Sequence, residues 1–238
     1  GSSGHLLAGA VAKRTGRTVL LVLAHLDDGD EAAEDLALFG DLAAEVFSAL
    51  EVMPGETNVS LELLSERLRI VRRLMDGDAP DVLVASIQSL MQSVPEPEAL
   101  GAMVRRITVG DEVDVGELGG WLAETGYTRT EAVEQPGEFA IRGGIVDVFV
   151  PGQTTPVRID LFGDEVDGLS EVDIESMGSN RKLDAVNLVG ASTEVIQAEQ
   201  RTTNLWSLVG DETIVVMQEP VEIAEQARGY YERLHDAR

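Results

Sequence analysis

The chain of 238 residues carries 43 acidic and 18 basic side chains, which gives a formal net charge of −25 at pH 7. A surface this acidic repels phosphate backbones, so the composition disfavours a nucleic-acid reader. The absence of cysteine excludes a disulfide framework and thiolate metal sites. The sequence shows no apolar run of transmembrane length and no signal peptide at its start, so we expect a cytoplasmic protein without a membrane partner.

Strands and helices alternate through the first ninety or so residues. An apolar run predicts a buried strand over 18–24, followed by an acidic helix over 27–39 and a short strand over 45–52. Apolar residues at helical spacing predict a helix over 61–75, and the next strand follows over 81–87. This alternation indicates a doubly wound α/β domain with a mostly parallel sheet.

The composition changes near residue 107, where the alternation of strands and helices gives way to a second section. After a short predicted helix over 117–125, Pro136 and Gly137 signal a turn, and the pair at 143–144 signals a bulge or a close approach of two backbones. Over 157–162, apolar residues alternate with Arg, Asp and Phe, which is the period of a strand with one buried face. We expect a small antiparallel sheet in this section.

The last section returns to α/β character. It contains a short predicted helix over 203–209, an apolar run over 213–217 that predicts a buried strand, and a helix over 221–234. A strand and a helix that follow an inserted β section indicate that the chain re-enters its first domain.

Two motifs in the β section carry a family resemblance. They are residues 137–149 (GEFAIRGGIVDVF) and 158–166 (RIDLFGDEV). Their order and spacing resemble the second domain of the UvrB/Mfd family, in which this domain docks onto UvrA, the damage-recognition ATPase of nucleotide excision repair. The segments at 94–97 (VPEP), 110–113 (GDEV) and 126–127 (GY) look more like the Mfd branch, the transcription-repair coupling factors, than like UvrB.

The resemblance implies an α/β fold in which a helicase-like parallel-sheet domain with a degenerate P-loop is interrupted by an α+β UvrA-docking domain. We therefore expect residues 1–108 to form the first part of the α/β domain, 109–190 the docking domain, and 191–238 the return segment. In the family, the ATP-driven translocase and the polymerase-binding domain lie elsewhere in the chain. ATP, magnesium, RNA polymerase and DNA would accordingly be engaged only through other domains of a parent protein.

A degenerate phosphate loop is expected at the start of the chain. A working loop needs a lysine for the phosphates and a hydroxyl residue for magnesium. At the corresponding positions this chain has a histidine and Leu6, and a short imidazole does not reproduce the lysine's fixed charge. We therefore expect neither a cofactor nor a catalytic or metal-binding residue in this chain. The degenerate loop consists of Gly1, Ser2, Ser3, Gly4 and His5.

The resemblance places the UvrA-binding residues at Arg129, Arg142 and Phe139. An arginine fork can pair bidentately with a carboxylate, and arginine is a frequent interface hot spot. The alternative is that both arginines are solvated charges on edge strands and that Phe139 belongs to the core. The acidic residues at 160–167 are interpreted as a solvated turn, and the four arginines of the helix at 61–75 as partners of nearby acids rather than of DNA.

These observations favour a non-catalytic module of a transcription-repair coupling factor, which binds UvrA and recruits excision repair to stalled RNA polymerase. One alternative is a UvrB-like ATP-binding repair subunit, which would need the lysine and hydroxyl residue that the first loop lacks. Another is a stand-alone UvrA-binding protein. The last is an α/β domain without a role in repair.

Overall fold

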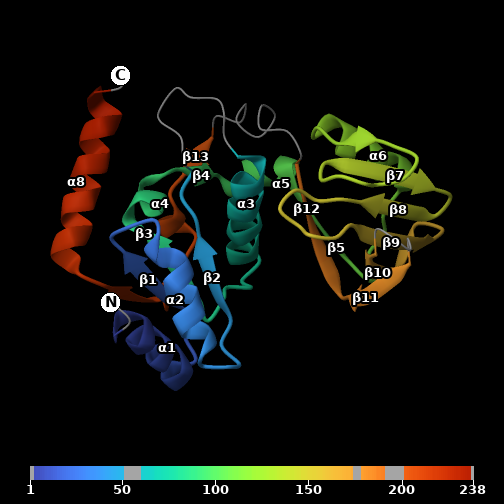
Figure 1. Ribbon diagram of the computed structural model, residues 1–238. Helices are drawn as coiled ribbons and strands as arrows, with labels where there is room; N and C mark the ends of the chain where they lie inside the picture. The colour runs from blue at the N-terminus through green and yellow to red at the C-terminus, as the bar shows by residue number, and fades with distance from the viewer. Residues whose placement is uncertain (1–2, 51–59, 174–177, 191–200, 237–238) are drawn as a thin grey trace. The chain divides into compact units, whose positions relative to one another are not determined.

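The computed structural model describes residues 3–50, 60–173, 178–190 and 201–236. The chain divides into two compact units (Figure 1). Unit 1 comprises Gly1–Glu96 and Arg201–Arg238, and unit 2 comprises Pro97–Gln200.

Unit 1 is built on a four-stranded parallel sheet with the strand order β14-β1-β3-β2. All residues of β1 and β3 are buried, as continuous apolar runs predict for central parallel strands. The sheet strands are β1 (Val19–Leu23), β2 (Ala44–Phe47), β3 (Val82–Ser86) and β14 (Ile214–Met217), and β4 (Val94–Pro95) pairs with β13 (Thr202–Thr203). The helices are α1 (Ser3–Thr15), α2 (Asp28–Ala37), α3 (Leu61–Met75), α4 (Ile87–Met91), α8 (Pro220–Asp236) and the 3-10 helix η1 (Leu205–Ser207).

Helix α3 shows how the sequence specifies this unit. Ser60 caps the helix by accepting a hydrogen bond from the backbone N–H of Leu63, and Leu64, Leu68 and Val71 bury one face. Each fully buried leucine contributes about 1.5–3 kcal/mol relative to an exposed one. The predicted bounds of this helix are confirmed.

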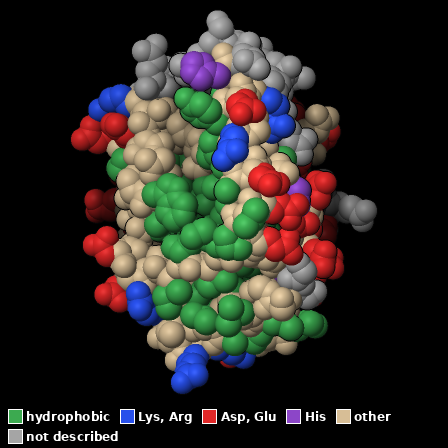
Figure 2. Space-filling model, turned by 90° about the vertical axis from the view of Figure 1, so that its left-hand side faces the viewer, with side chains coloured by type: hydrophobic (Ala, Val, Ile, Leu, Met, Phe, Trp, Pro, Cys, Tyr) green, Lys and Arg blue, Asp and Glu red, His purple; other side chains and the backbone are tan. Residues whose placement is uncertain are grey.

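Strand β14 corrects one expectation, because it is not a buried strand. It lies at the edge of the sheet, and Val215 and Met217 are 41% and 57% exposed. A short apolar run specifies a strand but not whether a second strand covers its other side. Figure 2 shows apolar side chains gathered on the side of unit 1 where α1, β14 and α8 lie.

Unit 2 contains a six-stranded sheet with the order β11-β10-β9-β8-β7-β6, antiparallel except for the parallel pair β6–β7. A separate antiparallel pair joins β5 to β12. The helices are α5 (Pro97–Met103) and α6 (Val115–Glu124). The strands are β5 (Val104–Thr108), β6 (Thr128–Arg129), β7 (Glu138–Arg142), β8 (Ile145–Val148), β9 (Val157–Phe162), β10 (Glu165–Val172), β11 (Ser179–Leu183) and β12 (Ala185–Val189).

The turns of unit 2 confirm two predictions made from glycines. Gly137 adopts a φ of +87°, a backbone conformation that side chains other than glycine rarely adopt. A Cβ built on Gly144 would lie 2.6 Å from the backbone oxygen of Leu161, so the close approach expected at 143–144 occurs between β8 and β9. The alternation predicted for 157–162 is also observed, with Val157 and Ile159 buried.

Within the described ranges, no helix is both long enough and apolar enough to cross a bilayer.

Candidate partner-binding surface

A buried carboxylate organises one face of the unit 2 sheet. Asp147 on β8 is fully buried, and the register places Arg158 of β9 directly opposite it. Arg158 donates from Nε and Nη2 to the two carboxylate oxygens at 2.7 and 3.0 Å. Arg142, at the end of β7, donates from Nη2 to the same group at 2.5 Å. We call these three side chains the arginine–carboxylate cluster.

The cluster carries one more positive charge than negative charge. The hydrogen bond from Arg158 to Asp147 raises the pKa of Arg158, so that guanidinium stays positively charged. Arg142 remains 48% exposed, and its guanidinium has five N–H donors, of which the carboxylate engages only part. The surface therefore presents an oriented, partly unsatisfied arginine fork in a chain that is otherwise strongly acidic.

The structure does not bring Arg129 and Arg142 together. Arg129 is exposed on the edge strand β6, where it pairs with Phe139 of β7. Residues opposite each other on neighbouring strands share a face, and successive residues alternate between faces. Arg142 is three positions beyond Phe139, so Arg129 and Arg142 leave the sheet on opposite faces. Arg129 is a charge at the rim of the sheet rather than a second member of the cluster.

Phe139 lies inside unit 2, with 2% of its surface exposed. It is on the face of β7 that packs beneath α6, because a Cβ built on Gly119 of that helix would approach both Phe139 and Ile141. This burial gives its ring no access to a partner and corrects the expectation of a direct contact. Phe139 supports the strand that carries Arg142.

The family motifs alone did not identify the other residues of this face. Asp147 and Arg158 meet only because the hairpins set their register, which local sequence does not encode. Phe162, at the end of β9, is 82% exposed. The alternation along the strand could have identified it, because Arg158, Asp160 and Phe162 are every second residue of β9 and therefore lie on the same polar face.

At the start of the chain, Gly1 and Ser2 lie outside the described residues, while Ser3, Gly4 and His5 begin α1. His5 is 2% exposed, and its Nδ1 lies 2.9 Å from a carboxylate oxygen of Asp35. A Cβ on Gly4 would lie 2.2 Å from the side-chain oxygen of Gln218, so that side chain occupies the space beside the first turn.

A pocket of about 310 Å³ lies at the carboxyl ends of the parallel strands in unit 1, the edge where doubly wound folds bind ligands. Its lining includes Asp27, Asp30 and Glu66. Carboxylates in this position repel phosphate groups, so the lining disfavours a nucleotide. Neither here nor in the rest of the described chain does any group of three or more histidine and acidic side chains have the arrangement of a metal site.

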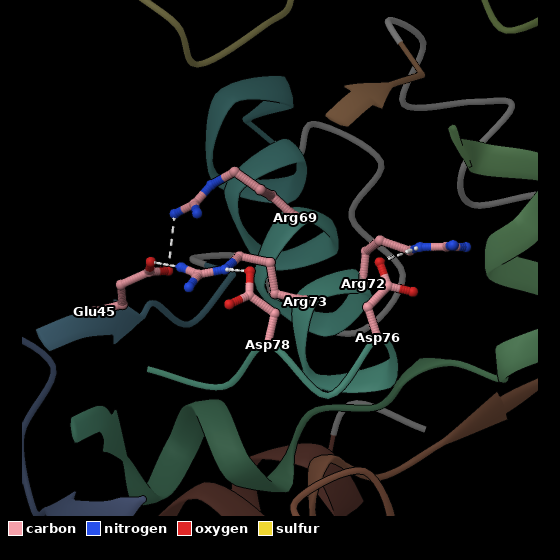
Figure 3. Close-up of polar contacts among 6 residues, drawn as sticks. All are labelled: Glu45, Arg69, Arg72, Arg73, Asp76 and Asp78. Carbon is pink, nitrogen blue, oxygen red and sulfur yellow. Dashed lines mark hydrogen bonds and ion pairs between the residues drawn. The ribbon is translucent and has the colours of Figure 1, made fainter. Parts of the chain in front are cut away.

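Three of the four α3 arginines pair with nearby acids, as expected (Figure 3). Glu45 of β2 points toward Arg69 and Arg73, with a distance of 3.1 Å to Arg69. Arg73 also reaches Asp78 at 3.0 Å. The remaining pair joins Arg72 to Asp76 at 3.1 Å. These ion pairs neutralise the helix face and leave little positive charge for DNA.

The fourth arginine, Arg67, differs from the expectation that each of these arginines pairs with a nearby acid. It is buried, its guanidinium carbon lies 4.1 Å from the ring centroid of Phe47, and Nη1 donates to the backbone oxygen of Ser48 at 2.6 Å. Desolvation lowers the pKa of Arg67 to about 10. Its stack on Phe47 makes it a packing residue of unit 1.

Comparison with known proteins identifies relatives of both units. The model of the UvrB interaction domain family matches residues 106–193. Transcription-repair-coupling factors of Bacillus subtilis (strain 168) and Mycobacterium bovis are 31% and 32% identical over 84% and 83% of this chain. That of Staphylococcus aureus (strain USA300) is 30% identical over 78% of it.

This chain spans only a small part of those relatives. The matched regions make up 17% of the Bacillus protein and 16% of each of the other two. The matched family range includes α6 and every strand of the sheet that carries the arginine–carboxylate cluster. Residues 106–193 therefore match the UvrB interaction domain family, within a mixed α/β chain that is similar over most of its length to the transcription-repair-coupling factors.

Proposed function

We propose that this chain is a non-catalytic docking module that binds UvrA and thereby recruits nucleotide excision repair to stalled RNA polymerase. The observation that carries the proposal is the arginine–carboxylate cluster, an oriented and partly exposed arginine within a UvrB interaction domain. RNA polymerase, DNA and ATP would be engaged through other domains of a longer protein.

Arg142 is the central contact in this proposal. Its guanidinium is held by a buried carboxylate, so little ordering entropy is lost when it meets a carboxylate of the partner. Arg129 contributes a weaker contact from the rim of the sheet, and Phe139 acts from within by supporting β7.

Unit 1 is proposed to be a helicase-like α/β domain whose P-loop has lost its function. His5 is bound to Asp35 rather than free to meet a phosphate, and Gln218 fills the space beside Gly4. We propose residues 1–108 and 191–238 as its two parts and 109–190 as the docking domain. The compact unit Pro97–Gln200 and the family match over 106–193 support boundaries close to these.

Titration calorimetry with UvrA from the same organism tests the docking role. We expect binding at micromolar affinity or tighter, and Arg142→Ala should weaken it by about 1–2 kcal/mol or more because a central arginine is lost. Arg129→Ala should cost less, about 0.5 kcal/mol, because rim charges contribute little.

The matched control is Arg181→Ala, which removes an exposed arginine from β11 at the opposite edge of the same sheet. This variant should bind like the wild type. A folded wild-type chain that fails to bind UvrA would exclude the docking function. Binding that survives in Arg142→Ala would retain the partner and reject the cluster as its contact.

A further inference from the structure

We propose that His25 and Glu222 form a pH-sensitive clasp, which holds the first turn of α8 on unit 1 while the imidazole is protonated and loosens when the imidazole loses its proton. The inference is independent of the docking function proposed above, because it concerns one helix of unit 1. Three observations carry it, namely a contact between distant parts of the chain, a strained link before α8, and the small number of buried side chains that hold this helix.

The two side chains of the clasp come from opposite ends of the chain. His25 lies in the connection between β1 and α2, and Glu222 lies in the first turn of α8. Nε2 of His25 is 2.8 Å from Oε1 of Glu222, although the two residues are 197 positions apart. The contact is possible because β1 and β14 are parallel neighbours, so their carboxyl ends meet at the same edge of the sheet. The clasp therefore connects the part of unit 1 that precedes unit 2 to the part that follows it.

The link between β14 and α8 is strained. Gln218 continues the pairing of β14, since its N–H donates to the carbonyl oxygen of Val22 at 3.0 Å. Glu219 then adopts a φ of +57°, in the left-handed region that residues other than glycine rarely occupy. Pro220 begins the helix, and its ring fixes its own φ. A residue in such a conformation persists only where its surroundings hold it, and the contact of His25 three residues further along supplies part of that restraint.

Few buried side chains hold α8, which contacts the rest of unit 1 chiefly through α4 (Figure 1). Ile223 and Tyr230 are buried, and Nε2 of Gln92 donates to the hydroxyl oxygen of Tyr230 at 3.3 Å. Val221 and Tyr231, by contrast, are 75% and 57% exposed. Elements with few buried apolar contacts open locally at low cost. A single contact at the first turn can therefore change how often α8 opens.

The charges around His25 favour its protonated form. The hydrogen bond to Glu222 is the main cause that raises the pKa of His25; partial desolvation opposes it, and the carboxylates of Asp28 on α2 and of Glu219 reinforce it. The same hydrogen bond lowers the pKa of Glu222, so this carboxylate stays ionised near neutral pH. The pKa of His25 is thus higher with α8 in place than with α8 detached. The clasp is closed below the ordinary imidazole pKa of about 6.5 and is lost as the pH rises through the raised value.

Hydrogen exchange of the α8 amides, followed by mass spectrometry on the whole 238-residue chain, tests the clasp. After correction for the intrinsic pH dependence of exchange, the opening equilibrium of α8 should be about twofold to fivefold larger at pH 8 than at pH 6, as for the loss of an exposed ion pair. In His25→Gln, the opening equilibrium should already have the larger value at pH 6, because glutamine carries no charge. Glu222→Gln should behave in the same way, and it should also lower the pKa of His25 in an NMR titration.

The matched controls are His235→Gln and Glu225→Gln, which make the same chemical changes at exposed positions of α8. His235 forms an edge contact with the ring of Tyr231, one turn away on the same helix. Both controls should keep the pH dependence of the wild type. An opening equilibrium that is the same at pH 6 and pH 8 in the wild type would overturn the proposal. So would a pH dependence of the opening that survives in His25→Gln.

Discussion

The carboxylate of Asp147 lies fully buried between the guanidinium groups of Arg142 and Arg158. Removal of one partner from a buried ion pair typically costs about 3–5 kcal/mol, because the remaining charge is left desolvated. Both arginines here retain some exposure, so we expect Asp147→Ala to lower the free energy of unfolding by about 2–3 kcal/mol. Chemical denaturation followed by circular dichroism measures this loss.

Asp164→Asn provides the control, because its side chain is exposed in the β9–β10 turn and should change stability by no more than about 0.5 kcal/mol. Equal stability of Asp147→Ala and the wild type would show that the cluster is not a structural element. The free energy of unfolding of Asp147→Asn should fall between those of Asp147→Ala and the wild type, because the amide keeps one acceptor oxygen for Arg158.

At the residue scale, the motif singled out Arg142 as a candidate contact, but it did not predict which side chains surround Arg142. The partners of Arg142 come from β8 and β9, and only the register of two hairpins brings them together. For Phe139, the motif predicted a contact with the partner, but side chains alternate between the two faces of β7 and that of Phe139 lies on the face that packs into the core.

At the scale of elements, Gly144 determines how closely two hairpins approach. A Cβ at this position would lie 2.6 Å from the backbone oxygen of Leu161, and a backbone atom cannot move aside as a flexible side chain can. We expect Gly144→Ala to destabilise the protein by about 1–3 kcal/mol through this clash. The displaced β9 end should also weaken the proposed binding to UvrA. Denaturation midpoints and calorimetry measure the two effects.

Gly120→Ala is the matched control. Gly120 is exposed in the middle of α6 and a Cβ there would meet nothing within 4 Å, so alanine should stabilise the helix by about 0.5–1 kcal/mol. If Gly144→Ala were also neutral or stabilising, the close approach would not constrain the hairpins.

Elements with strong local signals were predicted well from the sequence. Helix α3 has its cap, its apolar stripe and its stop signal within one stretch of chain, and the central strands β1 and β3 are continuous apolar runs. Strand β14 has the same kind of run, but its edge position depends on which segments lie beside it. That information is distributed over the whole unit, which is why the burial of β14 was predicted wrongly.

At the scale of the whole molecule, two opposing forces act on unit 1. Val215 and Met217 expose apolar surface on an edge strand, which in the described structure is hydrogen-bonded to β1 on one side only. Such edges tend to pair with other chains. The net charge of −25 opposes this association, because two copies repel each other before the edges can meet.

Salt should therefore control self-association of this chain. The Debye length falls from about 10 Å at 0.1 M salt to about 3 Å at 1 M, which removes most of the repulsion and leaves the apolar attraction intact. We expect light scattering to report a monomer at 0.1 M sodium chloride and a concentration-dependent rise in mass at 1 M. Met217→Lys should abolish the rise by placing a charge on the edge, whereas Leu38→Lys adds the same charge at an exposed helix end and should not. A monomer at both salt concentrations would mean that the β14 edge does not mediate self-association. A rise in mass that persists in Met217→Lys would mean that another surface mediates it.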